Sequence, residues 1–136
     1  MTITSSINEL SLQECRRLLD ENCLGRLGVI VQGKPFIFPV NYAFDSDAVV
    51  FRTDPGTKLA GAGFGPVVFE IDGQDDEGRD AWSVVVSGVS SEISDALDDV
   101  AGRLRELDVQ PWAPGDHAHW VALRAESITG RRVTRM

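Results

Sequence analysis

The segment Ala48–Leu59, AVVFRTDPGTKL, decides the fold that we expect for this chain. Its first half alternates, so Val49 and Phe51 share one face of a predicted strand and the residues between them face the other way. The strand ends at Asp54–Gly56, because proline fixes φ and glycine permits a tight turn. A short helix then starts at Thr57. The segment therefore predicts a strand, a turn and a helix start in immediate succession.

Polar side chains surround this turn in a pattern that suits an anion. Backbone N–H groups at the start of a helix lack partners, and such groups bind phosphate and similar anions. The chain contains only two lysines, and one of them lies here. The alternative is a solvated connection in which the polar side chains only cap the turn, and the segment alone leaves both interpretations open. The residues of the candidate cradle are Arg52, Thr53, Thr57 and Lys58.

The composition is that of one globular domain spanning residues 1–136. Its formal charge of −8 argues against nucleic-acid binding, because an acidic surface repels phosphate backbones, while a small anionic ligand remains compatible with a local basic cluster. No apolar run is long enough to cross a bilayer, and Met1–Leu10 lacks the pattern of a signal peptide. We therefore expect a cytoplasmic protein that contacts no membrane.

Alternating apolar segments predict about six strands, and the hairpin-type turns between the first three favour an antiparallel sheet. Pro39 removes one hydrogen-bond donor, so its strand should lie at an edge or carry a bulge. Gly88 marks a bend. Closure into a small barrel would remove the exposed edges of so small a sheet. The predicted strands are Gly25–Val31, Pro35–Phe44, the start of Ala48–Leu59, Pro66–Asp72, Ala81–Glu92 and His119–Ile128.

Two longer helices are inserted between these strands. Ser11 and Glu14 form a capping box, in which each side chain satisfies the backbone N–H of the other. The first helix has an apolar face of Leu12, Cys15, Leu18 and Leu19, and it stops near Asn22. Ser94 is predicted to cap the second helix, whose acidic residues Asp95, Asp98 and Asp99 suit its first turns and whose apolar stripe is Leu97, Val100, Ala101 and Leu104.

No pattern of catalytic or metal-binding residues stands out. We interpret Cys15 and Cys23 as buried or half-buried thiols, without a disulfide between them. His117 and His119 lie close in sequence, but a third metal ligand is not evident, and we expect no metal. No side chain is an obvious general acid or base, so the catalytic residues remain unidentified.

Five segments carry a resemblance to a known family: GRLGVIVQGKPFIFPVNYAFD, VVFRTDPGTKLA, VVFEIDG, WSVVVSGVSSEI and the C-terminal ITGRR. In this order they resemble the pyridoxamine 5′-phosphate oxidase-like family of flavin-binding split β-barrels, and PVNYAFD is similar to its nitroimidazole-resistance-like branch. The resemblance implies a mainly β fold, a six-stranded antiparallel Greek-key split barrel with two or three helices. It also implies a homodimer with FMN bound at the subunit interface. Related proteins use a deazaflavin, FAD or haem in the same groove, and the sequence leaves these alternatives open.

The resemblance assigns ten residues to the cofactor. Arg52, Thr53, Thr57 and Lys58 match its phosphate-binding strand and turn. A second strand passes the isoalloxazine ring, a polar residue with a neighbouring tryptophan touches that ring, and a C-terminal arginine reaches the cofactor across the dimer. The residues at these positions are Pro39, Val40, Asn41, Trp82, Ser83 and Arg131.

Departures from the family motifs limit what the resemblance implies about activity. True pyridoxamine 5′-phosphate oxidases carry a histidine near the C-terminus, whereas residues 128–132 read ITGRR, so we expect no such oxidase activity. The nitroimidazole-resistance branch usually has a histidine at the position of Arg52. The leading hypothesis is an FMN-binding oxidoreductase that reduces a small organic acceptor. The alternatives are a non-catalytic flavin- or haem-binding carrier or sensor, and a dimeric scaffold that has lost its cofactor.

Overall fold

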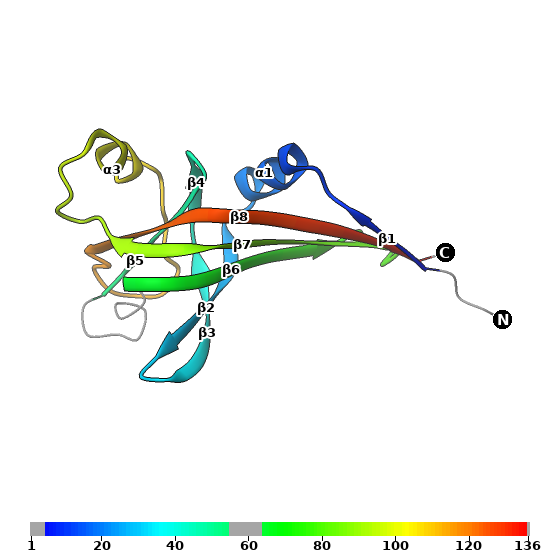
Figure 1. Ribbon diagram of the computed structural model, residues 1–136, viewed down its shortest axis with the longest axis horizontal. Helices are drawn as coiled ribbons and strands as arrows, with labels where there is room; N and C mark the ends of the chain where they lie inside the picture. Colours follow the sequence, from blue (N-terminus) through cyan, green and yellow to red (C-terminus); the bar gives the residue numbers. More distant parts are fainter. Residues whose placement is uncertain (1–4, 55–63, 136) are drawn as a thin grey trace.

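The computed structural model describes residues 5–54 and 64–135, which contain eight strands and two helices (Figure 1). No helix within these ranges is long and apolar enough to span a bilayer. In chain order the elements are β1 (Ser5–Glu9), α1 (Leu12–Glu21), β2 (Leu24–Val31), β3 (Lys34–Asn41), β4 (Ala43–Asp45), β5 (Ala48–Thr53), β6 (Phe64–Gln74), β7 (Asp80–Glu92), α3 (Asp99–Leu104) and β8 (His119–Arg135).

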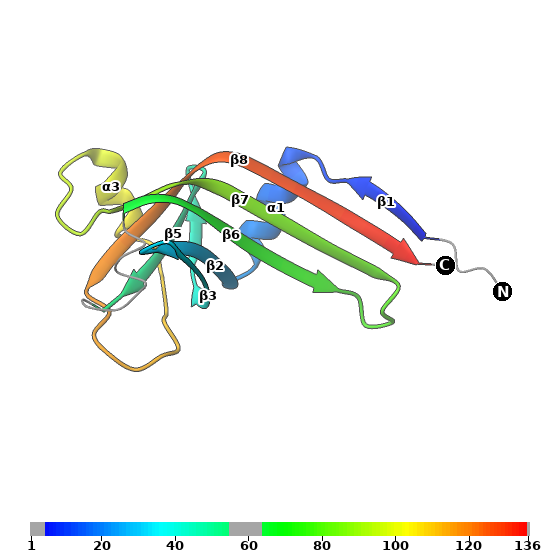
Figure 2. The ribbon, with the colours of Figure 1, turned by 60° about the horizontal axis from the view of Figure 1, so that its bottom comes forward.

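The strands form one antiparallel sheet in the order β3-β2-β6-β7-β8-β5-β4, and β1 pairs with the far end of β8. The long strands β6, β7 and β8 lie side by side, and the sheet curls into a half-barrel (Figures 1 and 2). This confirms the predicted mainly β antiparallel fold. Eight strands replace the expected six in the described ranges, because β1 was not predicted and Tyr42 separates β4 from β3.

Strand β5, which pairs with β8 and with the edge strand β4, divides the core as its alternation predicted. Val49 and Phe51 belong to the larger apolar cluster, together with residues of α1 and β2. Val50 faces the opposite way, into a smaller cluster beneath α3. Tyr42 joins α1 to the larger cluster, since its hydroxyl donates to the Leu19 carbonyl at 2.7 Å. Burial of this hydroxyl raises the pKa of Tyr42. Both faces of β5 are therefore buried.

Helix α1 follows the prediction with two exceptions. The Ser11 hydroxyl accepts a hydrogen bond from the Glu14 backbone N–H at 3.1 Å, but the Glu14 carboxylate pairs with Arg17 rather than completing the capping box. Leu12 is half exposed, at 46%, and so lies outside the predicted apolar face. The thiol prediction holds for Cys15, which is buried, and is wrong for Cys23, which is exposed just after the helix.

The second helix is shorter than predicted and begins later. Helix α3 covers only Asp99–Leu104, and Asp98 caps it by accepting from the Ala101 backbone N–H at 2.9 Å. The Ser94 hydroxyl instead accepts from the Trp120 backbone N–H at 2.9 Å, so it joins the chain to β8. Of the predicted apolar stripe, Ala101 and Leu104 are buried, while Leu97 and Val100 are exposed.

The predictions made for Pro39 and Gly88 agree with the pairing of the strands. Strand β3 pairs with β2 alone within the described residues, so Pro39 lies on an edge strand. The pairing of β7 with β8 shifts register between Ser87 and Gly88, which is the predicted bend. A Cβ atom on Gly88 would lie 2.0 Å from the Arg124 carbonyl oxygen, so the close approach of the two backbones requires glycine there.

Candidate functional site

Residues from β3, the end of β5 and the loop between α3 and β8 line a groove of about 370 Å³, which we call the loop groove. Five of the residues predicted to bind a cofactor line it: Pro39, Val40, Asn41, Arg52 and Thr53. The loop contributes Pro111, Trp112, Pro114 and His117. This volume lies within the range of ordinary small-molecule sites, and the mixture of apolar walls and a few polar groups is typical of them.

Arg52 ties the loop to β5. Its guanidinium donates to three backbone carbonyl oxygens of the loop, those of Val109 at 3.3 Å, Asp116 at 3.2 Å and His117 at 3.0 Å. The same group lies over the Trp120 ring, 5.1 Å from the ring centroid. Three of the five N–H donors of an arginine are thus directed at the loop. Arg52 therefore holds this wall of the groove in place.

Asp54, the residue after β5, and His117 form a second connection between this part of the chain and the loop. The Asp54 carboxylate accepts from the His117 backbone N–H at 2.7 Å, and its other oxygen lies 3.6 Å from the imidazole Nδ1. The imidazole Nε2 lies 2.7 Å from the Ala113 carbonyl oxygen, which fits a donated hydrogen bond. His117 has a positive φ of 48° and does not lie in a strand. The two contacts with Asp54 hold the loop beside the end of β5, and the contact with Ala113 lies within the loop.

Asn41 links the edge strand to the same loop. Its side-chain oxygen accepts from the Trp112 backbone N–H at 2.9 Å, and its amide nitrogen donates to the Cys23 carbonyl at 3.3 Å. The Trp112 side chain is 71% exposed. Figure 2 shows this loop extending beside β5, between α3 and the start of β8. Asn41, predicted to lie by the ring of a cofactor, therefore also positions the loop that carries Trp112.

The other predicted residues lie in a second hollow of about 440 Å³, which we call the strand groove. Trp82, Ser83 and Arg131 line it, from neighbouring strands β7 and β8. The Trp82 ring lies over Gly73, where a Cβ atom would come within 2.6 Å of it. Ser83 pairs directly with Arg131 across the strands. The structure thus separates the predicted site into two groups within one chain.

Acidic residues line one side of the strand groove. Glu70 and Asp72 lie two apart on β6 and share Arg26, whose guanidinium is 3.3 Å from a carboxylate oxygen of each. Burial raises the pKa of Glu70, and the neighbouring Asp72 carboxylate raises it further, while Arg26 opposes both effects. The alternation in PVVFEIDG places these carboxylates on one face of the strand, and this signal was available in the sequence.

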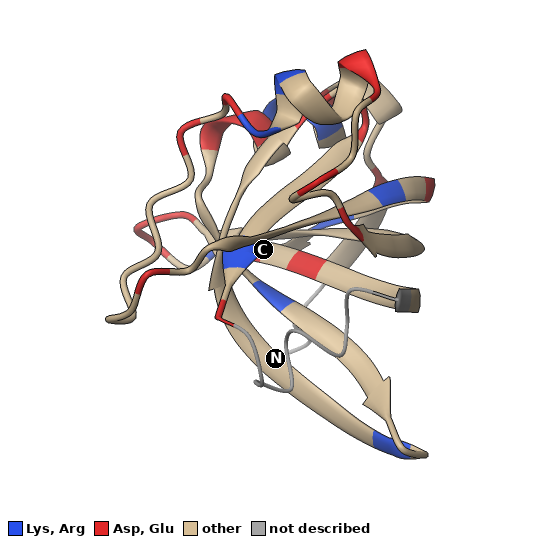
Figure 3. Cartoon of the chain, turned by 90° about the vertical axis from the view of Figure 1, so that its left-hand side faces the viewer, with Lys and Arg blue, Asp and Glu red and all other residues tan. Residues whose placement is uncertain are grey.

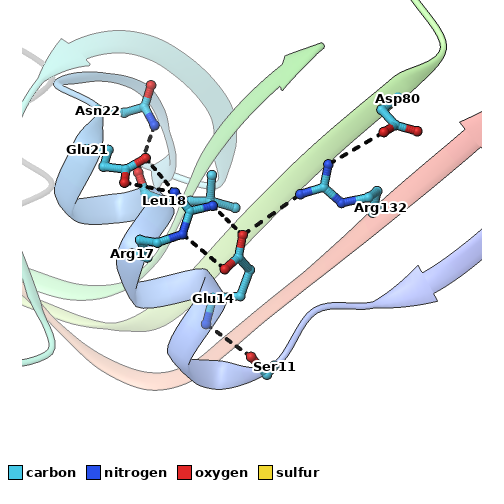
Figure 4. A network of polar contacts seen from close by, with 8 residues as sticks. All are labelled: Ser11, Glu14, Arg17, Leu18, Glu21, Asn22, Asp80 and Arg132. Atoms are coloured by element: carbon cyan, nitrogen blue, oxygen red, sulfur yellow. Dashed lines mark hydrogen bonds and ion pairs between the residues drawn. The ribbon is translucent and has the colours of Figure 1, made fainter. Parts of the chain in front are cut away.

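The two adjacent arginines of the C-terminal motif have different surroundings. Arg132 lies between α1 and β7, 3.9 Å from a Glu14 carboxylate oxygen and 4.0 Å from one of Asp80 (Figure 4). Arg131 is exposed, lines the strand groove and has no ion-pair partner within residues 5–54 and 64–135. Successive residues of a strand face opposite ways, which explains the difference. Arg131 is therefore the one available to a ligand.

The remaining sequence predictions have mixed outcomes. Thr57 and Lys58, with the turn and helix start around them, lie outside the described residues. His119 begins β8 and lies 2.6 Å from a Glu92 carboxylate oxygen, so it does not share a site with His117. No group of three or more potential metal ligands occurs in the described part of the chain. The contribution of Trp112 and His117 to the loop groove was not predicted.

Comparisons with known proteins agree with the fold. The family model for pyridoxamine 5′-phosphate oxidase matches residues 11–132. An uncharacterised protein of Mycobacterium tuberculosis is 35% identical over 131 residues, which cover 92% of this chain and 84% of that protein.

Two solved structures with similar folds are FAD-binding proteins. The one from Mycobacterium smegmatis is 34% identical, with a TM-score of 0.76 and coverage of 93% of this chain and 97% of the other. The one from Mesorhizobium loti is 26% identical, with a TM-score of 0.73 and the same coverages of 93% and 97%. The family match spans nearly the whole chain and includes all the segments on which the resemblance rests. The chain therefore belongs to the pyridoxamine 5′-phosphate oxidase family.

Proposed function

We propose that this protein is a flavin-binding oxidoreductase that reduces a small organic acceptor. The observation that carries the proposal is the loop groove, where five predicted cofactor residues from two separate strands line one hollow. Pro39 and Val40 offer an apolar wall to a planar ring, while Arg52 and Thr53 lie at the end of β5, next to the expected phosphate turn. The groove residues therefore fit a flavin.

The flavin would supply the redox chemistry, and the chain would supply binding and orientation. FMN is the flavin that the sequence resemblance implies, and FAD is the alternative, because the two solved relatives are FAD-binding proteins. Lys58 and Thr57 would hold the phosphate nearest the ribityl chain. The missing C-terminal histidine in ITGRR argues against oxidation of pyridoxamine 5′-phosphate itself.

We further propose that a second copy of the chain completes the site. Trp82, Ser83 and Arg131 line the strand groove rather than the loop groove, yet the sequence resemblance assigns both sets to one cofactor. Two copies related by a two-fold axis could place the strand groove of one against the loop groove of the other, giving two equal sites. Arg131, exposed and without an ion-pair partner in the described residues, would then be available to the flavin of the partner subunit.

A non-catalytic flavin carrier or sensor is the second candidate. It is favoured by the contacts of the charged side chains in the loop groove, since Arg52 and His117 bond to loop carbonyl oxygens and Asp54 accepts from the His117 backbone N–H. Among the described residues that line this groove, no side chain is thus an evident proton donor to a substrate. Haem in place of flavin is the further alternative that the resemblance left open.

The absorbance spectrum of freshly purified protein, before and after adding FMN or FAD, tests the proposal. We expect flavin bands. A Soret band would instead indicate haem, and a colourless protein that binds neither flavin would contradict flavin binding. Reduction of the loaded protein by NAD(P)H, followed by reoxidation with a small organic acceptor, separates the enzyme from the carrier. A flavin that NAD(P)H and chemical acceptors leave unchanged would favour the carrier.

A further inference from the structure

Trp112 is the most unusual side chain of the loop groove. It is 71% exposed, whereas Val109, in the same loop, is only 2% exposed and anchors the loop in the smaller core cluster. The other two tryptophans, Trp82 and Trp120, are half-buried and pack against the core clusters. Apolar side chains gain free energy when they leave water, and a large indole has most to gain. Trp112 is thus a large apolar surface that the described residues do not cover.

The backbone beneath this indole is firmly held. Asn41 accepts the Trp112 backbone N–H at 2.9 Å, and the next carbonyl, that of Ala113, lies 2.7 Å from the His117 imidazole nitrogen. Arg52 holds both ends of the loop through three carbonyl oxygens. Prolines at 111 and 114 restrict φ on either side of the tryptophan. A surface fixed in this way loses little conformational entropy when a ligand stacks on it.

We propose that Trp112 is the stacking platform for a planar heteroaromatic ring of the bound ligand. The proposal rests on the flavin-binding function proposed above and adds a specific residue and contact to it. Trp112 lines the same groove as Pro39 and Val40, so a ring that enters there meets the indole and the edge strand together. Aromatic rings stack on heteroaromatic bases without needing a particular hydrogen-bond pattern. The shared chemistry is a flat π-face, which either the isoalloxazine or the adenine of a dinucleotide can supply.

Four ligands separate these two sources. Lumiflavin carries the isoalloxazine ring without a phosphate, AMP carries adenine without a flavin, and FMN and FAD differ by the adenosine monophosphate portion. Each is titrated into the wild-type protein and into Trp112→Ala, with binding followed by flavin or indole fluorescence and by calorimetry. Trp112→Phe keeps an aromatic face. Leu97→Ala removes another exposed apolar side chain, 97% exposed and outside both grooves, and serves as the control.

Trp112→Ala should weaken binding of the stacked ligand by about tenfold or more, as expected for loss of one base-stacking aromatic. Trp112→Phe should restore much of that loss, and Leu97→Ala should have no effect. A loss for lumiflavin, FMN and FAD alike identifies the isoalloxazine as the stacked ring. A loss for AMP and FAD, with FMN unchanged, identifies the adenine. The difference in indole fluorescence between wild type and Trp112→Phe, measured during each titration, reports whether the bound ligand quenches Trp112.

The inference is overturned if the wild type binds flavin with the same affinity as Trp112→Ala and the Trp112 fluorescence does not respond. A change of oligomeric state in Trp112→Ala, with flavin affinity retained, would also overturn it, because the indole would then pack against a second copy. A wild type that binds none of the four ligands would refute the proposed function, and the stacking inference with it. Flavin binding by the wild type thus distinguishes failure of the stacking inference from failure of the proposed function.

Discussion

Arg52 holds the loop between α3 and β8, and this role limits what it can contribute to binding a phosphate. The resemblance assigned it to a phosphate, but its guanidinium donates to three loop carbonyl oxygens and lies over Trp120. Arginine has five N–H donors in a fixed fork, so only part of its capacity remains for another ligand. If a phosphate binds at the end of β5, Lys58 is then the more important cation of the cradle.

Lys58→Ala should weaken FMN binding by roughly ten- to a hundredfold. Charge-assisted hydrogen bonds are worth about 1.5–3 kcal/mol each, and about 1.4 kcal/mol corresponds to tenfold in affinity. Riboflavin, which has no phosphate, should bind wild type and variant almost equally. Lys34→Ala, at the first residue of β3 beyond the hairpin turn, is the matched control and should change neither affinity. Equal FMN affinity of wild type and Lys58→Ala would place the phosphate elsewhere.

Gly88→Ala should lower the free energy of unfolding by about 1–3 kcal/mol, the usual cost of forcing an extra methyl into a packed site. Its Cβ would meet the backbone carbonyl oxygen of Arg124 at 2.0 Å, and backbone cannot move aside as a side-chain tip can. Gly102→Ala is the control, because no atom lies within 4 Å of its Cβ position and alanine favours the helix. Urea denaturation of both variants measures the difference. A Gly88→Ala protein as stable as wild type would show that the bulge tolerates a side chain.

At the scale of elements, sequence pattern located strands better than it located helix ends. Alternation in β5 correctly predicted which residues enter each core cluster, because side chains in a strand alternate whatever the tertiary context. Helix starts depend on which of several capping residues the fold leaves available. Both Ser94 and Asp98 suit an N-cap, and Ser94 is instead bonded to the Trp120 backbone N–H of β8, a partner 26 residues away.

Contacts between residues far apart in sequence also limited what could be predicted of the candidate site. Pro39–Asn41 and Arg52–Thr53 were identified from motifs, and they do line one groove. Trp112 and His117 were missed as parts of that groove, since their positions depend on contacts with Asn41 and Asp54, 71 and 63 residues away in sequence. A local pattern shows that residues 109–118 form a loop, but not against which strand the loop packs.

Helix α3 gives a pH-dependent prediction. The hydrogen bond from the Ala101 backbone N–H lowers the pKa of Asp98 below its ordinary value of 3.8. Because the pKa is lower in the folded state, this contribution to stability is present above about pH 4 and is lost as the pH falls through the folded value. Asp98→Asn keeps a capping oxygen and cannot titrate, so part of the acid-induced fall in Tm should disappear. Asp98→Ala should lower Tm at pH 7.

Asp95→Ala is the control for this experiment. Asp95 is exposed and precedes the helix, so its removal should leave Tm unchanged at pH 7. If the helix began at Ser94, as the sequence predicted, Asp95 would lie in the first turn and its removal would cost stability. Thermal unfolding followed by circular dichroism between pH 3 and pH 7 distinguishes the two helix starts. A larger loss for Asp95→Ala than for Asp98→Ala would contradict the N-cap at Asp98.

At the scale of the whole molecule, one face of the sheet is apolar and uncovered within the described residues. Ile37 and Val68 lie on either side of Gly28 across strands β3, β2 and β6, and Ile30 follows on the same face of β2. Their exposed fractions are 65% for Ile30, 70% for Ile37 and 42% for Val68. Figure 3 shows that the β2–β3 hairpin carries few charged residues, one at its tip and one near the base of β2, in contrast to the helices and loops. We call these three residues the outer apolar face.

Exposed apolar patches rimmed by polar residues mark interaction surfaces, and an edge strand such as β3 is normally protected from unwanted pairing. A second copy of the chain would cover both features at once. In the proposed shared flavin site, the same second copy would bring its strand groove to the loop groove. The chain has a mass of 14.8 kDa, so light scattering at micromolar concentration should give about twice that value. A single species of the monomer mass would contradict the homodimer.

If the outer apolar face forms the proposed dimer interface, Ile37→Glu should give a monomer, because a carboxylate buried in an apolar interface must lose its hydration without gaining a partner. If the flavin site is shared between copies, the same variant should lose flavin although both of its own grooves are intact. Leu97→Glu, at a residue 97% exposed beyond the sheet, adds the same charge and should change neither property. A monomeric Ile37→Glu protein that retains wild-type flavin affinity would show that one chain holds the cofactor alone, and the strand groove would then need another role.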